Sequence, residues 1–110
     1  MTQDTVIDLD TMRTGAQAAC AMMKVLSNPD RLLLLCHLAE GEKRVGELEE
    51  LAAVAQPTLS QQLGVLRDEG LVITRREGKN IYYSIDSPQC IGVMQVLYEQ
   101  FCSPAKGKPA

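Results

Sequence analysis

The chain has 110 residues, of which 45% are hydrophobic and 23% charged, and its formal net charge is −3. These values are typical of one ordinary globular domain, and no apolar run approaches the roughly 20 residues of a membrane-spanning helix. The negative charge argues mildly against nucleic acid binding without excluding it, because DNA responds to local potential. We expect a single domain over residues 1–110, with flexible tails over residues 1–8 and 104–110.

The first predicted helix begins near Leu9 and ends at the Ser27-Asn28-Pro29 break. Its apolar residues recur at intervals of three and four over about five turns. Packing against another helix of the same chain is the first interpretation of this stripe, and a dimer interface is the second. The stripe consists of Leu9, Met12, Ala16, Ala19, Met23 and Leu26.

Two shorter helices are predicted next. Pro29 can start a helix that continues over residues 31–39, and Asp30 lies in its first turn, where a carboxylate favours the helix dipole. One face of this helix carries apolar side chains and includes Cys36. Residues 45–51 form a third, short helix, and residues 52–55 are the turn that follows it.

The stretch over residues 56–76 combines a polar-faced helix with a basic segment. Pro57 suits the first turn of the helix, and Gly70 is a natural stop. Ser, Thr and Gln side chains can hydrogen-bond base edges and phosphates in the major groove. A tight turn followed by such a helix is typical of a helix-turn-helix reader of DNA. The alternative is an ordinary amphipathic helix with a solvated face.

Residues 71–77 and 80–85 are extended, and Gly78-Lys79 between them predicts a β-hairpin with a basic tip. Ser87 and Pro88 then start a last helix. The predicted fold is therefore mainly α with a β-hairpin, a dimeric winged helix-turn-helix in the order α-α-α-α-β-β-α. The candidate DNA-binding residues are Gln56, Thr58, Ser60, Gln61, Gln62, Arg67, Arg75, Arg76 and Lys79. The candidate dimer interface comprises Leu9, Met12, Ala16, Ala19, Met23, Met94, Tyr98 and Phe101.

The acidic N-terminus has no secretory pattern, which predicts a cytoplasmic protein whose thiols are reduced by default. Its cysteines stand at positions 20, 36, 90 and 102, without a C-x-x-C pair, and there is one His. This pattern argues against a structural zinc site, and we expect no cofactor.

The order of these motifs resembles the ArsR/SmtB family of dimeric bacterial repressors. The resemblance covers about residues 22–103, and Gln62 stands where many members carry His. It implies a homodimer that binds double-stranded operator DNA. The residues that carry it are Leu26-Ser27-Asn28-Pro29-Asp30-Arg31-Leu32, Leu59-Ser60-Gln61-Gln62-Leu63, Leu66-Arg67, Glu69-Gly70-Leu71-Val72, Arg75-Arg76-Glu77-Gly78-Lys79 and Tyr82-Tyr83.

Residues 35–43 and 98–102 further resemble the persulfide-sensing repressors of the BigR and SqrR type. In that branch, one cysteine in the second helix and one at the end of the last helix form the sensor, and these match Cys36 and Cys102. The resemblance implies release from DNA when reactive sulfur species join the two cysteines by a disulfide or polysulfide, which derepresses sulfide-detoxification genes. Cys20 and Cys90 stay structural or unassigned.

Other functions stay open from the residues alone. Residues 45–51 lack the thiols, and residues 88–102 lack the His, of the family's metal-sensing branches. A repressor that senses a metalloid or copper(I) through its thiolates is the first alternative. A thiol redox enzyme using Cys36 is a less favoured one, since the chain has no His/Cys/Asp constellation, and we predict no enzyme. A protein-interaction domain that has lost DNA binding is the last.

Overall fold

The helices and strands of the computed structural model follow the predicted order closely. The structure describes residues 8–102. Its elements are α1 (Leu9–Leu26), α2 (Pro29–Ala39), β1 (Lys43–Arg44), α3 (Val45–Ala52), α4 (Thr58–Asp68), β2 (Val72–Glu77), β3 (Asn80–Ile85) and α5 (Pro88–Phe101). The predicted boundaries differ from these by at most two residues, within the usual uncertainty of helix and strand ends.

Most helix starts are explained by a local cap. The Asn28 side chain accepts a hydrogen bond from the Arg31 backbone N–H, and Ser87 accepts one from the Cys90 N–H. Asp8 caps α1 in the same way by accepting from the Thr11 N–H. Asp8, which we expected in a flexible tail, thus contacts the first turn of α1, where its carboxylate satisfies a donor that the turn leaves free. The rest of the two predicted tails lies outside the described residues.

The sheet is larger than the predicted hairpin. Its strand order is β1-β3-β2, and all neighbours are antiparallel. The short β1 pairs Lys43 with Tyr83 and Arg44 with Tyr82, on the edge of β3 that β2 leaves free. Two residues are too few to show a period-two pattern, which is why the sequence did not predict this strand. The strand ties the segment before α3 to the hairpin.

The core is aliphatic and centres on α2 and α4. The leucines at 34, 35, 48, 59, 63 and 66 are almost completely buried. Met94 of α5 is buried with them, so its side chain adds to the core of one protomer and offers little surface to a partner. Its assignment to the dimer interface needs this correction, because a helical stripe predicts a buried face without saying what buries it.

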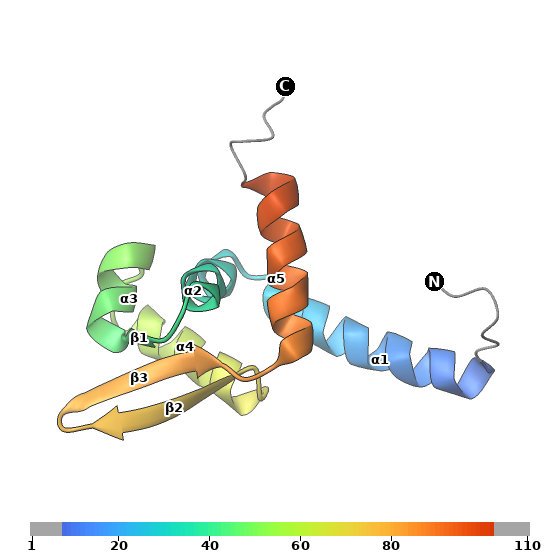
Figure 1. Ribbon diagram of the computed structural model, residues 1–110, viewed down its shortest axis with the longest axis horizontal. Coiled ribbons are helices and arrows are strands. Elements are labelled where there is room, and N and C mark those ends of the chain that lie inside the picture. The colour runs from blue at the N-terminus through green and yellow to red at the C-terminus, as the bar shows by residue number, and fades with distance from the viewer. Residues whose placement is uncertain (1–7, 103–110) are drawn as a thin grey trace.

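Two helices extend from this core. Figure 1 shows α1 projecting sideways from the body, α5 rising beside α2, and the β2–β3 hairpin extending to the lower left. Within the protomer α1 packs chiefly against α2, and α2 also packs against α4 and α5. Between residues 8 and 102, no helix has the length and apolar character that crossing a membrane requires.

Candidate functional site

Helix α4 presents a polar surface on the side opposite its buried leucines. Ser60, Gln61 and Arg67 are exposed, whereas Thr58 is half-buried. Gln56 is also exposed, and its side-chain oxygen accepts a hydrogen bond of 3.1 Å from the Ser60 backbone N–H. Gln56 therefore helps to satisfy the first turn of α4, and its amide nitrogen stays free to donate. The exposed side chains of Ser60, Gln61 and Arg67 suit contact with phosphates and base edges.

Gln62 differs from these neighbours. It is half-buried, and its Oε1 accepts a hydrogen bond of 2.9 Å from Nη1 of Arg31, at the start of α2. This amide is turned toward the protein, although the sequence placed it among the DNA-binding candidates. Arg31 was not among the candidate residues. In the sequence, Arg31 directly follows the Asn-Pro-Asp start of a helix, and this position does not reveal a partner that is distant in the sequence.

The basic residues of the hairpin are not equivalent. Arg75 forms a two-pronged ion pair with Glu42, with nitrogen–oxygen distances of 2.7 and 2.9 Å, and its Nη1 lies 3.1 Å from Glu77. Its guanidinium also stacks over the Tyr82 ring, 4.4 Å from the ring centre. These hydrogen bonds lower the pKa of Glu42 and raise that of Arg75. Glu42, distant in sequence, was missed as an acid near this basic cluster.

Arg76 and Lys79 remain exposed, and within residues 8–102 neither forms an ion pair. Arg67 on α4 is also exposed and forms no ion pair within the same residues. A surface of this kind suits the phosphate backbone of DNA, even in a chain whose net charge is negative.

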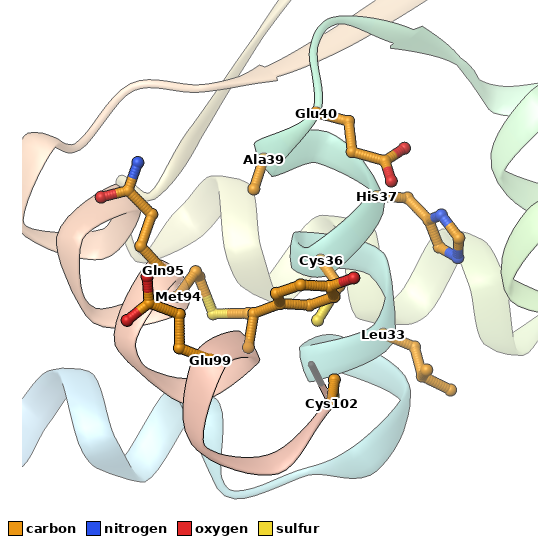
Figure 2. A pocket seen from close by; sticks show the side chains of 10 residues that line it. Leu33, Cys36, His37, Ala39, Glu40, Met94, Gln95, Glu99 and Cys102 are labelled. Carbon is orange, nitrogen blue, oxygen red and sulfur yellow. The ribbon is translucent and has the colours of Figure 1, made fainter. Parts of the chain in front are cut away.

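A second candidate site is a pocket of about 740 Å³ between α2 and α5. Figure 2 shows that one wall comes from α2, including Cys36, and the other from α5, ending at Cys102. Cys36 is half-buried and Cys102 is exposed. The fold thus brings these two cysteines to one pocket, although they are far apart in the sequence.

The surroundings of Cys36 disfavour its thiolate. Burial raises the pKa of the Cys36 thiol, and the nearby Cys102 and Glu40 raise it further. Glu99 lines the pocket as well, and among residues 8–102 no Lys or Arg lines it. His37 is half-buried and also lines the pocket. A thiol in this setting is largely protonated at neutral pH, so its reactivity is restrained.

The other two cysteines lie elsewhere. Cys90 is completely buried at the start of α5, and burial raises its pKa. Cys20 is exposed on α1. No group of three or more His, Cys, Asp or Glu side chains able to hold a metal ion occurs within the described part of the chain.

Comparison with known proteins decides the family. The model of the bacterial regulatory proteins of the arsR family matches residues 28–74. A biofilm growth-associated repressor from Agrobacterium fabrum is 47% identical over 98 residues, covering 89% of this chain and 84% of the relative. A protein of the same description from Xylella fastidiosa is 45% identical over 97 residues, covering 88% and 85%. The chain belongs to the bacterial ArsR family.

Solved structures of the ArsR family agree with this fold. The transcriptional repressor BigR from Xylella fastidiosa superimposes with a TM-score of 0.81 at 44% identity, covering 88% of this chain and 99% of that one. Reduced HlyU from Vibrio cholerae also gives a TM-score of 0.81, at 34% identity, covering 86% and 100%. These likenesses confirm the predicted winged helix-turn-helix. The named relatives are transcription regulators, which confirms that the chain is not an enzyme.

One further surface stands out in this member of the ArsR family. Large apolar side chains are exposed along α1 and along α5, where Tyr98 also lines the pocket between α2 and α5. They include five of the eight residues predicted to form a dimer interface: Leu9, Met12, Met23, Tyr98 and Phe101. Ala16 and Ala19 are exposed beside them on α1. Large exposed apolar side chains gathered on two helices mark a candidate interaction surface.

Proposed function

We propose that this protein is a homodimeric transcriptional repressor that binds operator DNA when reduced and leaves it when Cys36 and Cys102 are joined by reactive sulfur species. The observation that carries the proposal is the pocket between α2 and α5, lined by both cysteines. The relatives from Agrobacterium fabrum and Xylella fastidiosa are named as repressors, which supports repression as the direction of regulation.

The dimer follows from the exposed apolar side chains of α1 and α5. Burial of these side chains against a second copy removes them from water, which favours association. In a twofold-symmetric dimer, the two α4 helices enter successive major grooves when they lie about 34 Å apart. Ser60, Gln61 and Arg67 then face the groove, and Arg76 and Lys79 face the flanking phosphates.

The proposed chemistry uses sulfane sulfur as the oxidant. The Cys36 thiolate attacks the outer sulfur of an organic persulfide, gains that sulfur and releases the organic thiolate. The Cys102 thiolate then attacks the inner sulfur of the Cys36 persulfide and displaces hydrosulfide, leaving a disulfide. If both cysteines carry a persulfide, the terminal sulfur of one attacks the inner sulfur of the other and displaces hydrosulfide, which leaves a three-sulfur bridge. The longer bridge tolerates cysteines too far apart for a direct disulfide.

The crosslink acts on DNA binding through helix packing. Helix α2 contacts both α4 and α5, so tying Cys36 to the end of α5 pulls on the helix that supports the recognition helix. The end of α5 also carries Phe101, one of the side chains proposed for the dimer surface. After a small change in the spacing of the two α4 helices, only one of them can bind its half-site of the operator.

The test begins with a DNA duplex selected from a random library by the reduced protein. Fluorescence anisotropy measures the affinity of the protein for this duplex before and after the protein is treated with sodium tetrasulfide. Mass spectrometry identifies the crosslink. We expect treatment to release the wild-type protein and the Cys20→Ser control, but neither Cys36→Ser nor Cys102→Ser. Unchanged affinity in the fully crosslinked wild-type protein removes the sensing mechanism. Failure of the reduced protein to select any duplex removes the repressor function.

A further inference from the structure

Arg31 connects three helices through its backbone and side chain. Its Nε donates a hydrogen bond of 2.6 Å to the Val25 carbonyl in the last turn of α1, and its Nη1 donates one of 2.9 Å to Gln62 on α4. Its backbone N–H is held at 3.0 Å by the Asn28 side chain, which caps α2. One guanidinium thus joins the end of α1 to α4, from a residue fixed at the start of α2.

The guanidinium suits both partners for physical reasons. The last carbonyls of a helix lack partners within it, and they form the negative end of the helix dipole, so a cation is favoured beside Val25. Arg holds several N–H donors in a rigid fork, so it can bind two acceptors at a fixed separation. Lys presents a single ammonium at the end of a flexible chain and cannot hold both acceptors at that separation.

We infer that Arg31 is a positioning residue for DNA recognition, which acts through Gln62 to fix the orientation of α4 relative to α1. The inference rests on the proposed function as a dimeric DNA-binding protein. On this account Gln62 supports the recognition helix from behind and is not itself a reader of a base. The half-burial of Gln62 and the turn of its Oε1 toward α2 carry this assignment.

The position of this link gives it a role in regulation. Helix α1 bears much of the exposed apolar surface, α4 bears the polar surface, and Arg31 stands between them. It also lies on the same helix as Cys36, which contacts the α2–α5 pocket. A movement of α2 or of the dimer surface therefore reaches α4 through Arg31 as well as through packed leucines.

The test uses three single variants of the full-length reduced protein. Arg31→Lys keeps a cation beside Val25 but loses the fork, and Gln62→Met keeps the length of the side chain but loses the acceptor. Gln100→Met is the matched control, since Gln100 is an exposed glutamine on α5, outside the proposed DNA contacts. Affinity is measured for the selected duplex and for a second duplex with one base pair inserted between its half-sites.

We expect Arg31→Lys and Gln62→Met each to weaken binding to the selected duplex by about tenfold, the scale of one hydrogen bond to a charged group. The variant that carries both Arg31→Lys and Gln62→Met should bind no more weakly than either single variant, whereas Arg31→Lys and Gln100→Met should be additive. The loosened variants should also discriminate less between the two spacings. A residue that only stabilised the fold would leave this spacing preference unchanged.

Two results overturn the inference while leaving the proposed function intact. One is a large loss in Gln62→Met with none in Arg31→Lys, which would make Gln62 a direct contact. The other is additivity of those two variants. A further test needs no DNA. Both Arg31→Lys and Gln62→Met should speed hydrogen exchange of the α4 amides. Unchanged exchange in both would overturn the inference even if the wild-type protein selected no duplex.

Discussion

Arg75 of β2 and Glu42, which are 33 positions apart in the sequence, form an ion pair with nitrogen–oxygen distances of 2.7 and 2.9 Å. The pair holds the hairpin against the segment that precedes β1, and the stacking of Arg75 on Tyr82 adds to this. A DNA phosphate is the same kind of partner for a guanidinium as a carboxylate is. On the proposed function, a DNA phosphate would compete with Glu42 for Arg75.

Glu42→Gln should strengthen DNA binding by releasing Arg75. We expect an increase of about threefold at low salt, the scale of an exposed ion pair. If Arg75 then takes up a phosphate, the slope of log affinity against log salt steepens by about 1. Fluorescence anisotropy over a salt series measures both quantities.

Glu99→Gln on α5 is the charge-matched control, because it removes the same charge away from the hairpin. It should leave the salt slope unchanged. A weaker affinity in Glu42→Gln would show instead that the ion pair is needed to hold the hairpin in its binding position.

The pKa of Cys36 predicts how its reactivity depends on pH. Burial, Cys102 and Glu40 all raise this pKa, so the thiolate is scarcer at neutral pH than in an unstructured peptide. Alkylation of Cys36 by iodoacetamide, a neutral reagent, should accelerate about tenfold per pH unit, and its midpoint should lie above that of a peptide cysteine. Glu40→Gln removes one cause of the shift and should speed alkylation at pH 7. Glu50→Gln on α3, outside the pocket, should not.

A stability prediction concerns the start of α5. The Ser87 hydroxyl is nearly buried and accepts a hydrogen bond of 3.1 Å from the Cys90 N–H. Ser87→Ala leaves that donor without a partner and should lower the free energy of unfolding by about 1 kcal/mol, measured by urea denaturation. Ser27→Ala at the exposed end of α1 is the control, and its effect should stay within about 0.5 kcal/mol. If Ser87→Ala and Ser27→Ala lowered the free energy of unfolding equally, the Ser87 cap would not stabilise α5 as predicted.

Periodic features of the fold were predictable from the sequence, and isolated polar pairs were not. Leu59, Leu63 and Leu66 recur at intervals of three and four and are all buried, because a helix repeats its environment at that spacing. The pairs Arg31–Gln62 and Arg75–Glu42 each join residues more than 30 positions apart. A single polar residue carries no periodic signal of its partner, so both pairs emerged only from the structure.

The two cysteines proposed as a sensor were paired by a different route. Spacing alone did not pair Cys36 with Cys102, and the resemblance to a family branch did. The packing of α2 against α5 supplies the physical basis, since it brings both cysteines to one pocket. For Met94, the sequence did not distinguish a core position from an interface position. Its helical stripe fitted both a core and an interface, and only its burial within one protomer distinguishes them.

The exposed side chains of α1 give the sharpest test of the dimer. Met23 on α1 is 57% exposed, and Ile73 on the hairpin is 50% exposed. Met23→Glu and Ile73→Glu thus introduce the same charge at similarly exposed apolar positions. A carboxylate buried in an apolar interface without a partner is costly, so Met23→Glu should weaken dimerisation by about 100-fold or more. Sedimentation equilibrium over a concentration series measures this change.

Ile73→Glu should leave the dimer intact, because the proposed interface does not include the hairpin. Loss of the dimer should also change how DNA is bound. A monomer keeps one α4 helix and retains affinity for a half-site, but it loses the gain that comes from joining two half-sites. Met23→Glu should therefore bind a full operator and an isolated half-site almost equally. Equal dimerisation of both variants and the wild-type protein would place the interface away from the exposed face of α1 that carries Met23.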